Sequence, residues 1–491
     1  MKLVIISNRV PSPNADDQAG GLTVALRDAL SESGGVWFGW NGEAEEQRGT
    51  TPDMVRRDNI EFATLPLSKQ DLDGYYRGYA NMVLWPLFHE RLNIVEYREA
   101  FRASYASVNE YFAEGVTPLL DPDDLIWVQD YHLIPLGAEL RKRGVSGSVG
   151  FFLHTPLPPY DVFRVLPNYT ELLESFLAYD VVGMQTTIDV RHFADNMRHG
   201  LGANVDESTG TVELNGRRVR FGAFPIGIDV DKTAEIAHAN RDTAEGRRLV
   251  EVHAGRKLVI GADRLDYTKG LVKRLEAFDR FLGAHEDEMA NEMIYVQIAA
   301  PSRESVERYR AITRQLEAAA GRINGRKNRI GWTPLRLINR SIPRDALLGY
   351  FSLADVGLVT PLRDGMNLVA KEFLAAQTAE DPGVLVLSKL AGAADELSDA
   401  AVMVNPYDAE GVGEGLYRAL TMPMEERRRL WEVGMDRLRR NTARIWRDRF
   451  LDALVEEDGK SARPEHPRPR ARSRVLGRRG GSRSSSTTSA A

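Results

Sequence analysis

The sequence contains no cysteine among its 491 residues. This absence excludes disulfide bonds, thiolate catalysis and cysteine-ligated metals, and it is typical of a cytoplasmic protein. The sequence also lacks any apolar run of about 18 residues, so we expect no membrane span. An apolar strand pattern begins at Lys2, and we therefore expect no signal peptide.

Several motifs that carry familiar chemistries are missing as well. No G-x-G-x-x-G follows the first strand pattern, and there is no Walker loop. There is no H-E-x-x-H zinc motif and no G-x-S-x-G nucleophile elbow. Two Asp-x-Asp pairs, Asp121 with Asp123 and Asp229 with Asp231, have a spacing that some transferases use to bind a metal. The first pair lies in a natural turn, and we interpret both as structural, so we expect neither a metal nor a cofactor.

The formal net charge of -6 conceals a basic end. Residues 460–491 include nine Lys or Arg and one Glu, and they are rich in Pro, Gly and Ser. Such a composition cannot bury enough apolar surface to fold, so we predict a disordered tail over 459–491. The alternative to a solvated tail is a segment that binds nucleic acid or another anionic surface. We expect the solvated tail and no nucleic-acid partner.

Apolar runs bounded by turn residues recur along the chain, and most lack the polar alternation of half-exposed strands. The predicted strands include 35–40, 125–129, 149–154, 181–185, 221–228, 258–262, 294–299, 356–361, 384–388 and 401–405. The predicted helices include 95–113, 188–200, 271–282, 304–320 and one long amphipathic helix from 424 to about 455. This alternation predicts an α/β protein with parallel sheets.

The length predicts more than one domain, because single cores stop growing well before 491 residues. We place the boundary near Pro225–Asp229, where a polar helical stretch separates two strand-rich halves. The prediction is a doubly wound domain over 1–228, a second over 229–458, and the tail.

Two predicted strands have nearly the same sequence. Lys2–Arg9 reads Lys-Leu-Val-Ile-Ile-Ser-Asn-Arg, and Lys257–Arg264 reads Lys-Leu-Val-Ile-Gly-Ala-Asp-Arg. Ligands of open α/β sheets bind at the carboxyl edge of the strands, where each copy delivers an arginine. The pattern suggests two facing anion sites, although Lys-Leu-Val-Ile is also a common start of any parallel strand.

The richest candidate site is Leu362–Glu372, which follows an apolar strand. Gly365 permits a tight turn, and a helix is predicted to start near Met366. Free N–H groups at that helix start would lie beside Asp364 and suit a diphosphate. Glu372 lies on the new helix and could accept hydrogen bonds from ribose hydroxyls. An ordinary strand-to-helix turn is the alternative.

A second candidate site is Arg264–Gly270, in which Arg264 and Lys269 end a strand and open a helix. Two cations at such a position can neutralise a leaving diphosphate, although either alone could form a structural ion pair. The double glycine Gly20-Gly21 could let a phosphate approach the backbone, but it is equally compatible with a plain loop.

The first half also places polar residues at strand ends. Asp130 and His154 are the ones we select, because carboxylates bind sugar hydroxyls and a histidine can orient one. His132 is interpreted as a packed core residue. Tyr75–Tyr79 and Leu84–Pro86 put aromatic rings in a region predicted to be rich in loops, where they could stack on sugars or fill a core.

Together these residues resemble the trehalose-6-phosphate synthases, and the bacterial enzymes in particular. The resemblance runs from Leu3 to about Val455. Its most specific stretches are Ile6–Arg9, Trp37–Trp40, Val83–Pro86, Asp130–Leu133, Gly150–His154, Arg264–Gly270 and Leu362–Glu372.

The resemblance implies a GT-B glycosyltransferase, with two Rossmann-like domains facing each other across a cleft. Glucose would move with retention from a nucleotide-glucose, usually UDP-glucose, to glucose 6-phosphate, giving α,α-trehalose 6-phosphate. The sequence leaves the donor open among UDP-, GDP- and ADP-glucose. The implied acceptor-binding residues are Arg9, Trp40, Tyr76, Trp85, Asp130, Tyr131 and Arg303. The implied donor-binding residues are Gly21, His154, Arg264, Lys269, Asp364, Leu368, Val369 and Glu372. The implied catalytic residues are Asp130, His154, Arg264, Lys269 and Asp364.

The resemblance also implies that no metal and no assigned protein nucleophile take part. The mechanism that the resemblance implies is front-face, with the leaving phosphate taking the acceptor's proton. A sister enzyme that uses glycerol 3-phosphate or a cyclitol phosphate is one alternative. A non-catalytic sugar-phosphate sensor is another, and the presence of Asp364, Arg264, Lys269 and Glu372 disfavours it. We expect a homo-oligomer, a dimer or a tetramer.

Overall fold

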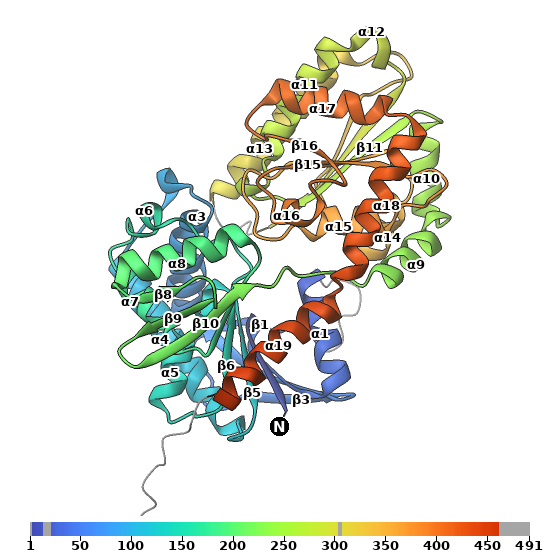
Figure 1. Cartoon of the computed structure of the whole chain (residues 1–491). Coiled ribbons are helices and arrows are strands. Elements are labelled where there is room, and N and C mark those ends of the chain that lie inside the picture. The colour runs from blue at the N-terminus through green and yellow to red at the C-terminus, as the bar shows by residue number, and fades with distance from the viewer. Residues whose placement is uncertain (1, 13–20, 303–306, 461–491) are drawn as a thin grey trace, which may run out of the picture.

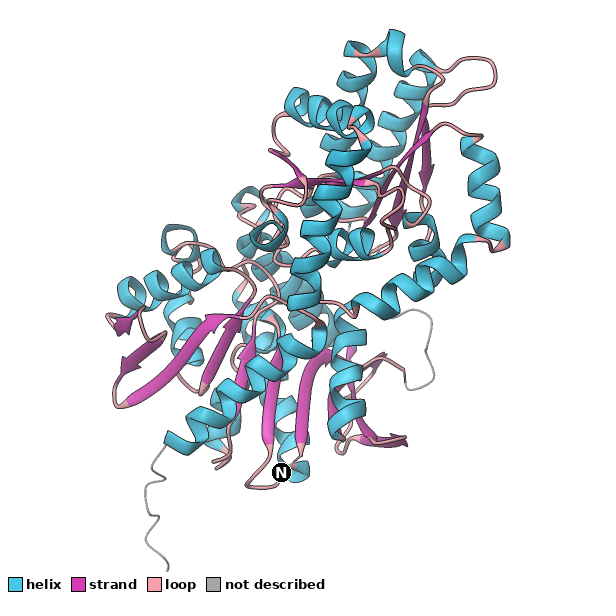
Figure 2. Ribbon diagram, turned by 45° about the vertical axis from the view of Figure 1, so that its right-hand side comes forward, coloured by secondary structure: helices cyan, strands magenta, loops and turns pink. Residues whose placement is uncertain are grey.

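The computed structural model describes residues 2–12, 21–302 and 307–460, and these form two lobes (Figure 1). Each lobe contains one sheet covered by helices on both faces (Figure 2). The α/β class and the two Rossmann-like lobes predicted from the strand pattern are therefore confirmed. The predicted tail lies outside the described residues, apart from its first two positions.

The sheet of the first lobe is parallel in its middle and antiparallel at both ends. Its order is β3 (Asp53–Arg57), β4 (Ile60–Ser68), β2 (Gly35–Glu45), β1 (Leu3–Arg9), β5 (Leu125–Gln129), β6 (Val149–Phe152), β7 (Val181–Met184), β10 (Arg217–Ala223), β9 (Thr211–Leu214) and β8 (Asn204–Asp206). In β1, Leu3 pairs with Gly35 on one side and with Leu125 on the other. Because β1 is central and buried on both faces, Arg9 is carried to the carboxyl edge of the sheet.

The sheet of the second lobe is parallel throughout. Its order is β13 (Leu335–Ile338), β12 (Met293–Ala300), β11 (Lys257–Arg264), β14 (Val356–Val359), β15 (Val384–Ser388) and β16 (Val402–Val404). The strand order reverses between β11 and β14, which creates the crevice where ligands of such sheets bind. The two sequence segments selected in this half follow directly from those two strands.

The helices pack between and over the strands. In the first lobe they are α1 (Gly21–Ser33), α2 (Lys69–Asp71), η1 (Leu72–Leu84), α3 (Trp85–Phe88), η2 (Leu92–Ile94), α4 (Glu99–Val116), η3 (Thr117–Leu119), η4 (Tyr131–Leu133), α5 (Leu136–Lys142), α6 (Tyr160–Phe163), α7 (Tyr169–Phe176) and α8 (Thr187–Leu201). After the first lobe they are α9 (Val230–Arg241), α10 (Ala244–His253), η5 (Tyr267–Lys269), α11 (Leu271–Ala284), α12 (Glu286–Met289), α13 (Glu307–Lys327), α14 (Arg344–Phe351), α15 (Leu368–Ala375), α16 (Ala394–Leu397), α17 (Ala409–Thr421), α18 (Met424–Arg440) and α19 (Ala443–Lys460). None of the described helices is both long and apolar enough to cross a membrane.

Two predictions were wrong. The aromatic segment around Tyr75 and Trp85 is helical rather than rich in loops, because it forms the wide helix η1 and then α3. The single helix predicted from 424 to about 455 is two helices, since the chain turns at Asn441 between α18 and α19.

The chain connects the lobes twice, as Figure 1 shows. It leaves the first lobe after β10 and returns through α18 into α19, which lies against the first sheet. Trp446 of α19 packs on Trp127 with ring centroids 4.9 Å apart, and Phe450 stacks on the same ring at 4.9 Å. The last described helix therefore completes the core of the first lobe.

Candidate active site

The donor side of the site is built around a buried carboxylate in the loop between β14 and α15. Asp364 Oδ2 lies 2.5 Å from Lys269 Nζ and accepts a hydrogen bond from Asn367 Nδ2 at 2.9 Å. Burial alone raises the pKa of a carboxyl group, but these partners outweigh it and hold the pKa of Asp364 below its ordinary value. Lys269 and Asp364 therefore face each other across the switch point as a preformed ion pair.

Helix α15 presents its N-terminus beside this ion pair. The helix begins at Leu368, two residues later than predicted, because Asn367 adopts φ 64° and caps it through Ala370 N–H. Gly21, at the start of α1 in the other lobe, lies directly against Leu368, since a Cβ on Gly21 would be 2.5 Å from Leu368 Cδ1. The structure thus brings together Gly21, Leu368 and the adjacent Val369, three of the residues implied for the donor.

Glu372 lies one turn further along α15 and is 6% exposed. Its Oε1 accepts a hydrogen bond from Arg344 Nε at 3.0 Å. Burial raises the pKa of Glu372 above its ordinary value, although the Arg344 guanidinium opposes this shift. Both residues border a small cavity that also includes Gly21 and Asp28. Arg344 was not predicted, because an arginine at the start of a short helix has no distinguishing sequence pattern.

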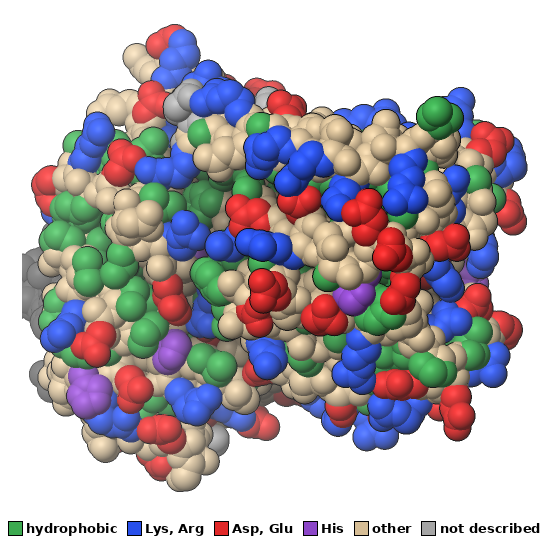
Figure 3. All heavy atoms as spheres, turned by 90° about the horizontal axis from the view of Figure 1, so that it is seen from above, with side chains coloured by type: hydrophobic (Ala, Val, Ile, Leu, Met, Phe, Trp, Pro, Cys, Tyr) green, Lys and Arg blue, Asp and Glu red, His purple; other side chains and the backbone are tan. Residues whose placement is uncertain are grey.

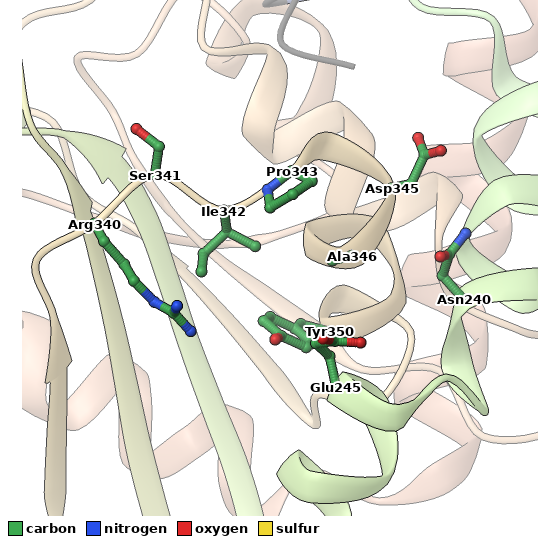
Figure 4. Close-up of a pocket in the computed structure, with 9 residues that line it drawn as sticks. All are labelled: Asn240, Glu245, Arg340, Ser341, Ile342, Pro343, Asp345, Ala346 and Tyr350. Atoms are coloured by element: carbon green, nitrogen blue, oxygen red, sulfur yellow. The ribbon is translucent and has the colours of Figure 1, made fainter. Parts of the chain in front are cut away.

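A larger cavity lies beside the residues that precede Arg344. It has a volume of about 350 Å³ and is lined by residues of the β13–α14 loop, α14, α9 and α10. Figure 4 shows the side chains of Arg340, Ile342 and Tyr350 around this hollow. Four of the residues that line this cavity, 340–343, directly precede Arg344 in the sequence.

The acceptor side of the site is an aromatic wall in the first lobe. Trp40 and Tyr76 rings lie 5.6 Å apart, and Trp85 and Tyr131 rings lie 5.7 Å apart. The Arg9 guanidinium lies 5.8 Å from the centre of the Trp40 ring, and Arg9 is exposed at the end of β1. All five residues were predicted as acceptor contacts, and the structure gathers them at one sheet edge.

His132 lies behind this wall. Its ring is stacked on Tyr76 at 5.9 Å and packs against Tyr131 at 4.0 Å, and the residue is 9% exposed. The interpretation of His132 as a packed residue is confirmed.

Asp130 and His154 follow adjacent strands, and the Asp130 side chain is bonded to the His154 backbone. Asp130 Oδ1 accepts a hydrogen bond from His154 N–H at 3.1 Å. Asp130 adopts φ 71° and ψ 168°, a conformation that is costly for any residue with a Cβ and that is found mostly at functional sites. The strained backbone fixes where the carboxylate points.

The His154 ring is buried and neutral, because burial lowers its pKa to about 3. Nε2 lies 2.9 Å from Gln129 Oε1, which can only accept, so Nε2 carries the proton. Nδ1 accepts a hydrogen bond from Gln185 Nε2 at 3.0 Å. Both ring nitrogens are thus engaged by glutamines, so the orientation of the ring is fixed and neither nitrogen is free to carry a proton to a ligand.

The two lobes are in contact at the site. A Cβ on Gly365 would lie 2.2 Å from the His154 carbonyl oxygen, so the donor loop rests directly on the end of β6. Trp85 Nε1 of the acceptor wall donates to Asp266 Oδ1 at 3.4 Å, and Asp266 belongs to the loop that carries Lys269. Asp266 was not singled out from the sequence, although it lies inside a selected motif.

His89 is another residue that the sequence did not reveal. It is 4% exposed, and its ring lies 4.2 Å from that of Trp85. Burial lowers the pKa of His89 to about 4, and the charges of Asp266, Asp364 and Lys269 all act on it. A neutral histidine thus stands at the point where the acceptor wall meets the donor loop.

The two arginines of the doubled strand belong to different sheets. Arg9 ends β1 beside the aromatic wall, whereas Arg264 is exposed at the end of β11 on the donor side. Arg303, which was predicted to bind the acceptor, lies outside the described residues. Among the described residues, no group of three or more His, Asp or Glu side chains could hold a metal ion.

Comparisons with known proteins agree with this geometry. The family model described as glycosyltransferase family 20 matches residues 6–456. A trehalose-6-phosphate synthase of Sinorhizobium fredii is 45% identical over 459 residues, which cover 92% of this chain and 98% of the relative. The Burkholderia xenovorans alpha,alpha-trehalose-phosphate synthase (UDP-forming) in complex with glucose-6-phosphate is 44% identical, with a TM-score of 0.89 and coverage of 93% and 100%. An E. coli structure described as bound with UDP-2-fluoro glucose is 41% identical, with a TM-score of 0.87 and coverage of 92% and 99%.

Two Rossmann-like lobes that meet at such a site define a glycosyltransferase of the GT-B class. The chain belongs to glycosyltransferase family 20, and the resemblance to the trehalose-6-phosphate synthases is confirmed.

Proposed function

We propose that the protein transfers glucose from UDP-glucose to glucose 6-phosphate with retention of configuration, releasing UDP and α,α-trehalose 6-phosphate. The observation that carries this proposal is the contact between two parts of the site. One is the donor corner, formed by the Lys269–Asp364 pair and the N-terminus of α15, and the other is the aromatic wall beside Arg9. Relatives that align over more than nine-tenths of both chains support the choice of substrates, since one is described in complex with glucose-6-phosphate and another with UDP-2-fluoro glucose.

The donor would lie along the edge of the second sheet. Arg264, Lys269 and the N-terminus of α15 would bind its diphosphate, and Asp364 would accept a hydrogen bond from its glucose. Glu372 would take the ribose through Oε2, because the Arg344 contacts are made to Oε1. The base would lie toward the 340–343 loop, which leads directly into Arg344.

The acceptor would lie against the first lobe. Arg9 would pair with its phosphate, with Tyr76 beside it, and the rings of Trp40 and Trp85 would pack on the apolar face of the sugar. Asp130 would accept a hydrogen bond from a sugar hydroxyl. In this placement the anomeric hydroxyl would face the Lys269 loop, whose Asp266 accepts a hydrogen bond from Trp85 of the aromatic wall.

The reaction would form the bond between the acceptor oxygen and the anomeric carbon while the bond from that carbon to the diphosphate breaks. The acceptor's proton would pass to the departing phosphate oxygen on the same face. His154 would not take it, because both ring nitrogens are already engaged. Arg264, Lys269 and the α15 N-terminus would stabilise the charge that grows on the diphosphate.

A substrate matrix tests this proposal. Purified protein is incubated with UDP-, GDP- or ADP-glucose and with glucose 6-phosphate or glycerol 3-phosphate, in the presence of EDTA. The expected result is metal-independent formation of trehalose 6-phosphate, with an α,α linkage in its NMR spectrum, from UDP-glucose and glucose 6-phosphate. Turnover with glycerol 3-phosphate alone would favour the sister enzyme, and binding without turnover would favour the sensor.

A further inference from the structure

A fully buried arginine on α11 bonds to both loops of the donor corner. Arg274 is 1% exposed, although it lies only one turn from the start of its helix. Its Nε donates to Thr360 Oγ1 at 2.9 Å, and its Nη2 donates to the Lys269 carbonyl at 3.3 Å. Its Nη1 donates to Asp263 Oδ2 at 2.7 Å and to Gln297 Oε1 at 3.0 Å. One guanidinium therefore connects four segments at the carboxyl edge of the second sheet.

These segments surround the switch point. Lys269 belongs to the loop after β11, and Thr360 follows β14, the strand on the other side of the crevice. The two loops are also joined directly, because Leu362 N–H donates to the Thr268 carbonyl at 2.7 Å. Gly270 adopts φ 68°, and a Cβ there would lie 2.8 Å from the Thr360 carbonyl oxygen. The loops thus pack tightly, with Arg274 beneath them.

Stability alone does not explain a buried ion pair, because apolar side chains of similar volume are often as stable or more so. A guanidinium differs from such side chains by presenting several donors in a fixed plane. Here the donors reach the backbone of Lys269 and the hydroxyl of Thr360 at the same time. Asp263 also interacts electrostatically with the two cations Arg274 and Lys269 and with the carboxylate of Asp364, so positive and negative groups are interspersed at this edge.

We propose that Arg274 is a positioning residue for the donor diphosphate, which sets the distance between the Lys269 loop and the Asp364 loop. Asp263 is its partner in this role, because it neutralises and orients the guanidinium. The inference rests on the proposed function, since it assumes that the diphosphate lies between these two loops. It goes further than the proposed function, because it assigns the distance between the Lys269 loop and the Asp364 loop to a side chain that would not touch the ligand.

The test compares UDP with UMP by isothermal titration calorimetry on the full chain, because the two ligands differ by the β-phosphate. Arg274→Met should weaken UDP binding on the order of tenfold while UMP binding changes by less than about twofold. Arg274→Lys should behave like Arg274→Met, because an ammonium cannot reproduce the planar set of contacts. Thr360→Val removes a single acceptor with little change of volume, so it should show a smaller loss in the same direction even if Arg274→Met folds poorly.

Arg427→Met is the matched control. Arg427 of α18 has a side chain that is 11% exposed, and it pairs with Asp381 and donates to the Pro382 carbonyl. This variant should lower the melting temperature without changing the ratio of UDP to UMP affinity. Equal losses for both nucleotides in Arg274→Met, no loss in any variant, or full rescue by lysine would each overturn the inference. Failure of the unsubstituted protein to bind UDP would overturn the proposed function, and this inference with it.

Discussion

At the scale of single residues, Arg9 and Arg264 occupy equivalent ends of similar strands but face different substrates in the proposed reaction. Arg9→Ala should raise the KM for glucose 6-phosphate by roughly tenfold or more, because a charge-assisted contact to phosphate is lost. The affinity for UDP should remain unchanged. Steady-state kinetics and UDP titration measure the two effects, and Arg56→Ala, at an exposed position of β3, is the control. Equal losses for both substrates would contradict separate anion sites.

The burial of His154 predicts how the free energy of unfolding depends on pH. An unfolded histidine titrates near 6.5, whereas the pKa of His154 in the folded protein is about 3. Between these values the unfolded chain binds the extra proton, so stability is lost as the pH falls below about 6.5. His154→Gln should therefore reduce the decrease in the free energy of unfolding between pH 7 and pH 5 by about 2 kcal/mol. Denaturant titrations at both pH values check this, and the exposed His199→Gln should leave the decrease unchanged.

At the scale of elements, the β14–α15 loop is packed too closely against β6 to accept a side chain at Gly365. A Cβ there would lie 2.2 Å from the His154 carbonyl oxygen, and backbone cannot move aside as a flexible side chain can. Gly365→Ala should lower kcat/KM on the order of 100-fold, because the donor loop and the acceptor wall would be displaced by about 1 Å. Gly283→Ala, where no atom lies within 4 Å of the new Cβ, should retain full activity. Wild-type kinetics of Gly365→Ala would show that the lobes need not touch at this point.

The elements that the sequence predicted well are those buried on both faces. β5 and β15 match their predicted bounds, because apolar runs without alternation leave few alternatives. β3 was missed because all five of its residues are exposed and polar or mixed in character. The region of Tyr75–Tyr79 and Leu84–Pro86 was predicted to be rich in loops, but it is helical, and its buried residues pack in the core of the first lobe. The prediction of secondary structure from local sequence was therefore wrong where contacts between distant residues determine the structure.

The sequence predicted some residues of the candidate site but not the contacts between them. Motif residues such as Asp364 and Lys269 follow strands, so their meeting at one edge could be inferred. The ion pair between them could not, because it depends on which strands are neighbours. Arg344, His89 and Arg274 carry no local signal, since their roles depend on burial beside partners far away in the sequence.

At the scale of the whole molecule, a buried polar cluster joins both connections between the lobes. Lys371 of α15 donates to the Ile226 carbonyl at 2.6 Å and pairs with Glu396. Asn441 Nδ2 donates to the Pro225 carbonyl at 2.8 Å and to Glu396 Oε1 at 2.6 Å. Because Lys371 lies on the same helix as Glu372, the crossing segments are tied to the donor site.

Glu396→Ala should lower the free energy of unfolding by about 3 kcal/mol, since it leaves the Lys371 ammonium buried without its partner. Replacing both residues, as in Lys371→Met with Glu396→Leu, should recover most of this loss. The turnover of the double variant should be lower than that of the unsubstituted protein, because the hydrogen bond from Lys371 to the Ile226 carbonyl is lost. Urea denaturation and kcat measurements separate the two effects, and full recovery of turnover would show that the cluster contributes stability alone.

The charges on one face of the molecule are of both signs (Figure 3). Figure 3 shows Lys and Arg interspersed with Asp and Glu over the described residues of one face of the molecule. On this face, the described residues form no extended patch of positive charge (Figure 3).

The return of α19 to the first lobe has a consequence for synthesis. Trp127 and Phe152 emerge from the ribosome roughly 300 residues before the helix that covers them, so the nascent first lobe exposes an apolar surface until almost the whole chain has been made. A gene truncated at the first connection would encode a polypeptide without that cover, prone to self-association. The core of the first lobe is thus complete only after the second lobe has been synthesised.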